Sequence, residues 1–317
     1  MARDRGEEGE DGVAVLLPGQ GAQAVGMGRD LAEAYTEAAR LWEEAEAVLD
    51  VPLREICWEG PEEELTRTEN AQPAILLHSY VAWRLLPEDV RSSVVAAAGH
   101  SLGEFTAYLV AGALSFEEAL RLVRRRGELM ARSEEGTMAA VLGLDDGEVE
   151  AACREAGGVV VAANFNAPGQ VVISGAVDAV ERAGERAREA GARRVLPLDV
   201  SGAFHSPLME VAREGLAGAL ETAELGAPRF PVVANASGEA VEDAETARRL
   251  LVQQLTSPVR WVACVERIRE MGPGRWLELG PGTVLSGLCR RIDRSLDVTS
   301  VGDAEAMRTE RGEARDG

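Results

Sequence analysis

Two short runs without a polar residue constrain the fold of this chain more than any other feature. Residues 13–17 read Val-Ala-Val-Leu-Leu, and residues 94–98 read Val-Val-Ala-Ala-Ala. Strands that are apolar on both faces are typical of parallel sheets with helices on either side. Stretches with helical periodicity separate the runs and follow them, at 31–48, 74–86 and 116–130. The sequence therefore predicts an α/β fold with a parallel sheet.

The pattern changes between residues 135 and 203, where shorter elements alternate. A strand, a helix, two strands, a helix and a last strand are expected in that order. This β-α-β-β-α-β order is that of a ferredoxin-like unit. We therefore expect a small ferredoxin-like subdomain at 135–203, inserted into a large α/β-hydrolase-like catalytic subdomain made of 12–134 and 204–300. An acidic tail at 1–11 and a charged tail at 301–317 are expected to be solvated.

The charge and the cysteines narrow the class of protein. The formal net charge is −21, which argues against nucleic acid as a partner, because phosphate binding needs a basic surface. No run approaches the roughly 20 apolar residues that span a bilayer, so neither a membrane segment nor a secretion signal is expected. The four cysteines are scattered without a C-x-x-C pair, which argues against a metal site and favours reduced thiols. We predict a cytoplasmic protein that binds no metal.

The basic residues are all arginine, because the sequence contains no lysine. Schiff-base chemistry, attachment of pyridoxal phosphate and a phosphate-binding P-loop each need a lysine. All three are therefore excluded.

A nucleophile is predicted at Ser101. Residues 99–103 read Gly-His-Ser-Leu-Gly, which fits G-x-S-x-G, with a buried strand before it and a helix after it. This strand-to-helix turn holds a serine hydroxyl at the edge of a sheet, and the helix N-terminus supplies amide donors for an oxyanion. The pentapeptide alone would also fit an ordinary glycine-rich turn.

A serine nucleophile needs a base, and the chain has only three histidines. His78 falls within a predicted helix and is expected to be a packing or partly exposed residue. His100 adjoins the serine, too close in sequence for its ring to face the hydroxyl easily. His205 lies in a predicted loop after the last strand of the small unit, from which its ring could reach the edge of a neighbouring strand. His205 is the predicted base by elimination, with a structural histidine as the alternative.

Arg126 is predicted to point inward. The apolar stripe of helix 116–130 runs through Phe116, Ala119, Leu120, Val123, Gly127 and Met130. Arg126 falls at its margin and Arg125 on the opposite side. An inward arginine favours a carboxylate as its partner, which a guanidinium holds in a bidentate fashion. Arg126 is therefore a candidate for binding a carboxylate of the substrate. Arg124 and Arg125 are expected to be solvated.

Two other classes remain as alternatives. Residues 19–24 fit G-x-G-x-x-A after a strand, the fingerprint of a dinucleotide-binding oxidoreductase. However, Glu43 and Glu44, the acids about twenty positions on, fall within a predicted helix instead of at a strand end. A serine esterase would share the serine turn, but it usually keeps an acid beside its histidine and has no need of Arg126.

With these residues in place, the chain resembles the malonyl-CoA:acyl carrier protein transacylase family over nearly all of residues 13–300. The segments that carry the likeness follow the family's order and are PGQGAQ (18–23), GHSLGE (99–104), RG (126–127), NFNAPGQ (164–170), GAFH (202–205), QL with PV and W (254–261) and ELGPG (278–282). Each is weak alone, but the ordered set is specific.

The resemblance implies roles at the matching positions. Ser101 would carry the acyl group, and His205 would act as base and then as acid. Gln20 would lie near the oxyanion hole, whose donors would be backbone N–H groups such as that of Leu102. Backbone carbonyl groups near Gln254, instead of an aspartate, would orient the histidine.

The acyl pocket would involve three further positions. Asn166 would help to shape it, and Gln254 is also placed in the substrate-binding set. A phenylalanine at the position of Phe204 accompanies malonyl selectivity in related acyltransferases. Relatives often carry Phe where Leu17 stands, and we expect only local repacking from this difference.

The resemblance also implies the substrates and the partner. The chain would move malonyl from malonyl-CoA to the phosphopantetheine thiol of acyl carrier protein for fatty acid biosynthesis, without a cofactor, as a monomer. A discrete acyltransferase of polyketide synthesis or of malonate decarboxylase would share this chemistry. Because both this chain and such carriers are acidic, docking would need a local basic patch, at Arg193 and Arg194 or at Arg290, Arg291 and Arg294.

Overall fold

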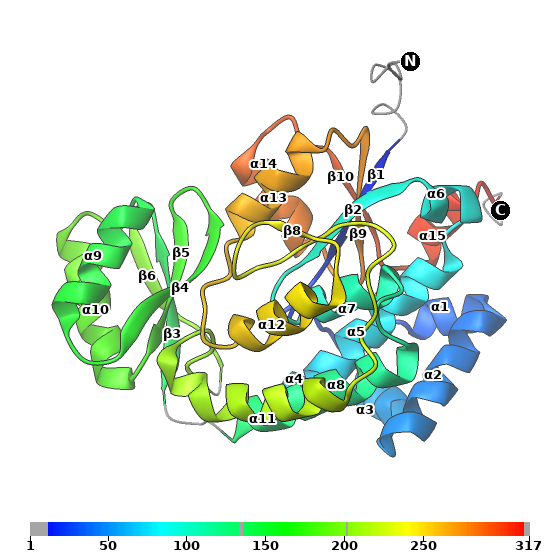
Figure 1. The fold of residues 1–317 in the computed structure, drawn as a ribbon, viewed down its shortest axis with the longest axis horizontal. Helices are drawn as coiled ribbons and strands as arrows, with labels where there is room; N and C mark the ends of the chain where they lie inside the picture. Colours follow the sequence, from blue (N-terminus) through cyan, green and yellow to red (C-terminus); the bar gives the residue numbers. More distant parts are fainter. Residues whose placement is uncertain (1–11, 133–135, 201, 314–317) are drawn as a thin grey trace.

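A mostly parallel sheet of six strands forms the centre of the large subdomain (Figure 1). The structure is a computed structural model that describes residues 12–132, 136–200 and 202–313. The order across the sheet is β10-β9-β1-β2-β7-β8, and only the pair β7 and β8 is antiparallel. The strands are β1 (Val13–Leu17), β2 (Val94–Gly99), β7 (Val232–Val233), β8 (Ala240–Val241), β9 (Arg275–Leu279) and β10 (Val298–Val301). The predicted parallel sheet is confirmed.

Helices cover both faces of this sheet, which explains why β1 is apolar throughout. Val13, Val15 and Leu17 face one hydrophobic core, while Ala14 and Leu16 face a second. Helices α13 (Trp261–Glu270) and α14 (Val284–Ile292) contribute to the second core. Those that contribute to the first are α1 (Arg29–Ala34), α2 (Thr36–Leu49), α3 (Leu53–Glu59), α4 (Glu62–Thr66), α5 (Thr68–Leu85), α7 (Leu102–Val110), α8 (Phe116–Ala131), α11 (Glu210–Thr222), α12 (Ala244–Gln254) and α15 (Ala304–Glu310). Two short elements, α6 (Glu88–Ser92) and the 3₁₀ turn η1 (Pro207–Met209), complete the subdomain.

The small subdomain is the ferredoxin-like unit that the sequence predicts. It consists of β3 (Thr137–Leu142), α9 (Asp146–Ala156), β4 (Val160–Ala167), β5 (Gln170–Gly175), α10 (Val177–Glu189) and β6 (Arg194–Pro197). Its antiparallel sheet has the order β4-β5-β3-β6, and α9 and α10 cover one face around a separate hydrophobic core. It lies beside the large subdomain (Figure 1). Val259, after α12, pairs with β4 and joins the two subdomains.

Over residues 301–313, the described part of the expected charged tail at 301–317, the C-terminal segment differs from that expectation. Residues 298–301 form β10, and α15 packs Ala304 and Met307 against the first core. Two carboxylates fix its start: Asp303 accepts from Ala306 N–H and Asp30 accepts from Ala304 N–H. Two buried side chains in one short helix give too weak a periodicity to be seen in the sequence. The predicted tail at 1–11 lies outside the described residues.

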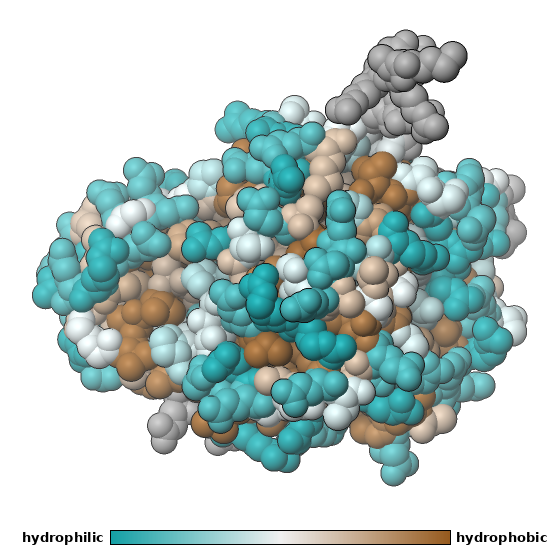
Figure 2. Space-filling view, viewed as in Figure 1, coloured by the Kyte–Doolittle hydropathy of each residue, from teal (hydrophilic) through white to brown (hydrophobic). Residues whose placement is uncertain are grey.

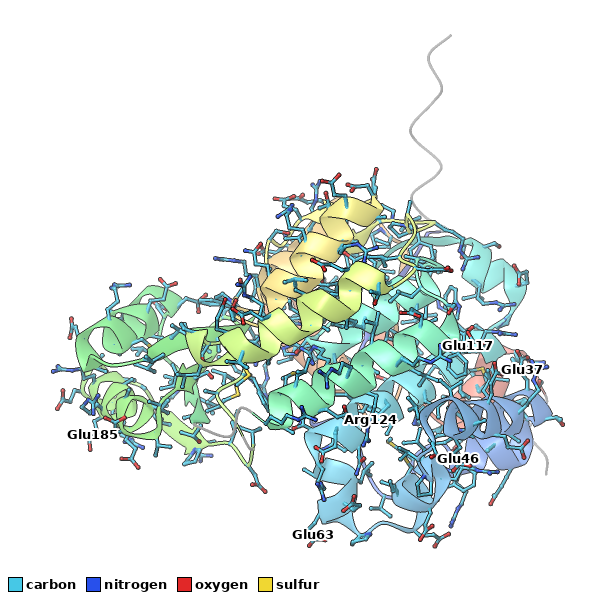
Figure 3. All side chains as sticks on the ribbon, turned by 60° about the horizontal axis from the view of Figure 1, so that its bottom comes forward. Glu37, Glu46, Glu63, Glu117, Arg124 and Glu185 are labelled. Atoms are coloured by element: carbon cyan, nitrogen blue, oxygen red, sulfur yellow. The ribbon has the colours of Figure 1, made fainter. Side chains whose placement is uncertain are left out.

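Acidic side chains account for the surface charge. The face in Figure 2 is largely hydrophilic, with separate apolar patches. Glu63 on α4 and Glu185 on α10 are exposed and project outward (Figure 3). Among the described residues, no helix has the length and apolar character needed to cross a bilayer.

Candidate active site

Ser101 lies in a tight turn between β2 and α7. Its backbone adopts φ 51° and ψ −102°, a conformation that is costly for a residue with a side chain. The glycines on both sides allow this turn. A Cβ on Gly99 would lie 1.8 Å from the carbonyl carbon of Gly103, and one on Gly103 would lie 2.1 Å from the carbonyl oxygen of Leu17. The predicted strand-to-helix turn is confirmed.

His205 meets Ser101 from the loop before η1. Its Nε2 lies 2.8 Å from Ser101 Oγ, and its Nδ1 lies 2.9 Å from the main-chain oxygen of Gln254. A carbonyl oxygen can only accept, so Nδ1 is the protonated nitrogen and Nε2 is free to accept from the serine hydroxyl. The backbone of His205 also has a positive φ, 58°. The histidine chosen by elimination is thus the one that faces the serine.

The environment keeps His205 neutral. Burial and then the nearby charge of Arg126 lower the pKa of His205 to about 3, although the hydrogen bond to Gln254 acts in the opposite direction. A neutral imidazole is the form that can accept the serine proton.

Arg126 is buried in the wall of the site, with 1% of its surface exposed. Its Nη2 donates to Ser101 Oγ and to the side-chain oxygen of Gln254, both at 3.0 Å, and its Nη1 donates to Gln72 at 2.8 Å. Among the described residues, no carboxylate forms a salt bridge with it. The predicted inward orientation is confirmed, while Arg125 lies on the surface with Glu128.

Arg124 differs from the expected solvated side chain. Its Nη1 donates to the backbone oxygen of Glu69 at 3.0 Å and to Asn70 at 2.8 Å, and its side chain is 23% exposed. These partners lie on α5, so Arg124 joins α8 to α5. Helical periodicity could not reveal carbonyl acceptors on a neighbouring helix.

Backbone amides beside the serine form the candidate oxyanion hole. Ser101 N–H already donates to Asn235 Oδ1 at 2.7 Å, so it is occupied. Leu102 is the first residue of α7, where an amide has no acceptor within the helix. Gln20 lines the same cavity, and its side chain donates to Thr68 at 3.2 Å. The geometry therefore favours Leu102 over Ser101 as a donor.

A cavity of about 380 Å³ lies between the two subdomains and contains the serine. Asn166 and Phe204 line it, as expected for pocket residues. Asn166 Oδ1 also accepts a hydrogen bond from His100 Nε2 at 2.8 Å, so the ring of His100 binds Asn166 and not the serine. The rest of the lining is mainly apolar and includes Met130, Met138, Val172 and Leu198.

Gln254 plays a different part from the expected substrate contact. It is fully buried and is not among the described residues that line the cavity. Its side chain bonds Arg126, the main-chain oxygen of Ser101 and Glu104. Gln254 therefore holds Arg126 and the turn of Ser101 in place without lining the cavity. Its main-chain oxygen orients His205, as the resemblance implied.

Sequence reasoning missed three polar residues that hold the site. Gln72 and Asn235 carried no signal, because they become neighbours of the site only through folding. Glu104 belongs to the GHSLGE segment, but that motif alone does not indicate that its side chain is buried. It is fully buried beneath the serine. His78 is also buried and binds the main-chain oxygen of Gly302, away from the site.

The dinucleotide-binding alternative fails on topology. The glycines of residues 19–24 lie in a loop after β1, and the chain continues into α1 and α2. Glu43 and Glu44 are in α2, and the next strand is β2 at Val94. A Rossmann unit needs its acid at the end of the second strand. In addition, this loop contributes Gln20 to the serine cavity.

Comparison with known proteins agrees with this geometry. The acyl transferase domain family matches residues 15–311, so the chain is an acyltransferase by class. The malonyl CoA-acyl carrier protein transacylase of Bacillus subtilis (strain 168) is 42% identical over 301 residues, which are 93% of this chain and 95% of that protein. The chain belongs to the malonyl CoA-acyl carrier protein transacylase family.

Solved structures show the same fold over the whole length. An acyl carrier protein S-malonyltransferase from Vibrio cholerae O1 biovar eltor has a TM-score of 0.89 and 42% identity, and the match covers 94% of this chain and 99% of that one. A malonyl-transacylase in complex with its type II PKS acyl-carrier protein has a TM-score of 0.91 and 44% identity, with 95% and 99% covered.

Proposed function

We propose that this chain transfers a malonyl group from malonyl-CoA to the phosphopantetheine thiol of an acyl carrier protein, and so supplies fatty acid biosynthesis. One observation carries the acyl choice: the buried guanidinium of Arg126 lies 3.0 Å from Ser101 Oγ. An acyl group held at this serine meets a cation, which favours an acyl chain that ends in a carboxylate. An esterase acting on simple acyl groups would gain nothing from this charge.

The first half-reaction forms a malonyl ester on Ser101. His205 Nε2 accepts the hydroxyl proton while Oγ attacks the thioester carbonyl carbon. The carbonyl oxygen takes up the negative charge, which the Leu102 N–H and a donor from the Gln20 loop stabilise. The intermediate then collapses, the carbon–sulfur bond breaks, and His205 returns the proton to the sulfur of coenzyme A.

The second half-reaction reverses these steps with a new thiol. His205 removes the proton of the phosphopantetheine thiol, and the sulfur attacks the ester carbonyl. The carbon–oxygen bond to Ser101 breaks, and Oγ regains the proton from His205. The apolar lining of the cavity limits the access of water to the ester, which favours transfer over hydrolysis.

A basic surface beside the cavity supports docking of an acidic carrier. Both arginine pairs predicted from the sequence line one depression between β6 and α14, together with Arg294. We call this set the arginine basin; it consists of Arg193, Arg194, Arg290, Arg291 and Arg294. All five are exposed, and among the described residues none forms a salt bridge with an acid. Gln170 lines both the basin and the serine cavity, so the two adjoin.

The basin stands out because many other surface arginines are paired. Arg54 with Glu46, Arg182 with Asp178 and Arg267 with Glu270 are examples. Unpaired positive charge on an acidic protein offers the local attraction that an acidic partner needs. We therefore assign carrier docking to the arginine basin.

A polyketide carrier is the second candidate partner. The solved relative bound to a type II PKS acyl-carrier protein favours it, with 44% identity to this chain. The chemistry at Ser101 would be unchanged. Transfer rates to a fatty-acid carrier and to a polyketide carrier, measured in competition, would separate the two.

The site is complete within one chain, which supports action as a monomer. Ser101, His205 and Arg126 belong to one chain, and Ser101 Oγ bonds both His205 and Arg126. The four cysteines are buried and free, which fits a reducing compartment such as the cytoplasm.

The covalent intermediate is the direct test of the proposed function. The protein is incubated with malonyl-CoA alone, and its intact mass and peptide masses are measured. We expect one malonyl group on Ser101, which is lost when a phosphopantetheinylated carrier is added. Ser101→Ala should remain unlabelled. An unlabelled wild-type protein, or a malonyl group on another residue, would refute the proposal.

A further inference from the structure

Glu104 is a buried carboxylate directly beneath the nucleophile, and the mechanism above does not use it. It is the third residue of α7 and has no exposed surface. Its Oε2 accepts from the main-chain N–H of Asn235 at 2.9 Å and from Gln254 Nε2 at 2.7 Å. Its Oε1 is buried and has no hydrogen-bond partner among the described residues. A carboxylate in such a place is costly unless its charge is compensated nearby.

Gln254 connects Glu104 to the reacting groups. Its side-chain NH₂ donates one hydrogen bond to Glu104 and one to the main-chain oxygen of Ser101 at 3.0 Å. Its side-chain oxygen accepts from Arg126 Nη2 at 3.0 Å. A carboxylate can only accept, so it holds the NH₂ end of the amide toward itself. The oxygen end must then face Arg126.

This arrangement gives Arg126 a counter-charge without direct contact. Burial lowers the pKa of Arg126 to about 10, and Glu104 acts in the opposite direction by favouring the charged guanidinium. A direct salt bridge would occupy the N–H groups of the guanidinium. Because Gln254 lies between the two charges, Nη2 still reaches Ser101 Oγ, where the acyl group is held.

Glu104 also supports the strained turn. Glu104 accepts a hydrogen bond from the main-chain N–H of Asn235. The side chain of Asn235 in turn accepts from Ser101 N–H through Oδ1 at 2.7 Å and donates to the carbonyl oxygen of Gly99 through Nδ2 at 2.8 Å. The carboxylate of Glu104 thus contacts both Asn235, which holds the turn, and Gln254, which holds Arg126.

We propose that Glu104 is the positioning residue of this site: through Gln254 it orients the guanidinium of Arg126, and it supplies the negative charge that faces this cation before the carboxylate of the substrate arrives. The inference rests on the proposed malonyl transfer. It adds that malonyl selectivity depends on a residue that the substrate never touches.

The test measures the rates at which Ser101 is acylated by malonyl-CoA and by acetyl-CoA, by rapid quench and mass spectrometry. Glu104→Gln removes the charge and can present an NH₂ group to Gln254. We expect malonylation to slow about tenfold to a hundredfold and the ratio of malonyl to acetyl rates to fall about tenfold. Glu104→Asp keeps the charge and should restore part of the ratio.

A double-mutant cycle asks whether Glu104 acts through Gln254. Gln254→Ala removes the side chain but keeps the carbonyl that binds His205. If the proposal holds, adding Glu104→Gln to Gln254→Ala slows malonylation little further. Glu310→Gln is the matched control. The side chain of Glu310 is only 5% exposed, and it binds Arg275, but neither residue lines the cavity. Its variant should acylate as the wild type does.

Folding of each variant is checked by circular dichroism and thermal melting. If Glu104→Gln does not fold, Glu104→Asp carries the same comparison of rates. A folded Glu104→Gln variant with unchanged acylation rates would overturn the proposal. The proposal would also fail if Glu104→Gln slowed malonylation and acetylation equally and its effect were additive with that of Gln254→Ala. Failure of the wild-type protein to become malonylated would instead refute the proposed function.

Discussion

The two walls of the serine cavity differ in how firmly their side chains are held. In the large subdomain, Ser101, His205 and Arg126 are linked by hydrogen bonds, and the two ionisable groups are 4% and 1% exposed. In the small subdomain, Leu198 in the cavity lining is half-buried, and Arg193, at the other end of β6, is exposed in the adjoining arginine basin. The comparison teaches that the reacting groups lie in a fixed core, whereas the carrier docking that we propose lies at the solvated arginine basin. Substitutions on the two sides should therefore differ in size and in kind.

The largest effect is expected at the base. His205→Ala should lower kcat for malonyl transfer by about 10⁴-fold, because no other described residue that bonds Ser101 Oγ can act as a base. Steady-state transfer to a carrier measures this. His78→Ala is the control, since His78 is buried and, among the described residues, its ring bonds only Gly302. Retention of more than about a tenth of the activity in the His205 variant would contradict the assigned base.

The second largest effect is expected at Arg126, the buried cation beside Ser101. Arg126→Ala should lower kcat/KM for malonyl-CoA by about a hundredfold or more, because the substrate carboxylate loses its buried partner. The rate with acetyl-CoA should fall much less. Arg125→Ala, one position away on the surface, serves as control. Equal losses with both substrates would show that Arg126 supports the fold and does not select the acyl group.

Substitutions in the arginine basin should have a smaller effect, and only on transfer to the carrier. Reversing the charge of Arg290 and Arg291 should slow transfer to the carrier about tenfold at low salt, and added salt should reduce the difference. Formation of malonyl-Ser101 should change little. Arg182 and Arg186, on α10, give the matched charge reversal away from the basin. An equal loss in both half-reactions would mean that the basin binds phosphate groups common to both thiols.

The smallest effect concerns pH. Burial raises the pKa of Glu104 to about 7, although the charge of Arg126 on α8 acts to lower it. Two further titratable groups face this carboxyl, Cys264 on α13 and Tyr108 on α7. The carboxylate is charged above this pKa, so malonylation should rise a few-fold as the pH increases through about 7. His205, with its pKa near 3, stays neutral across this range. Glu104→Gln should lose the inflection, and a persistent inflection would assign it elsewhere.

The sequence predicted the parts of this molecule that depend on local patterns. The apolar runs gave β1 and β2, and the glycines around Ser101 indicated the turn. Three histidines were few enough for elimination to reach His205. Periodicity placed Arg126 inward, because a helix face can be followed from residue to residue.

The remaining features depend on contacts between distant segments. Asn235 binds the turn of Ser101 across 134 positions of the chain, and no local pattern marks it. Arg124 was expected in solvent, but it finds acceptors on α5. Helix α15 forms because two side chains reach a core that the rest of the chain builds.

The imidazole of His205 is oriented by the main-chain oxygen of Gln254, and every amino acid at position 254 would supply that oxygen. No exchange of one side chain for another can delete that oxygen, so a systematic mutational survey would record no orienting residue for His205. Only a change that moves the chain near Gln254, such as a shift at the end of α12, would turn the ring. The orientation of the base is thereby tied to the path of the backbone and is insulated from most substitutions.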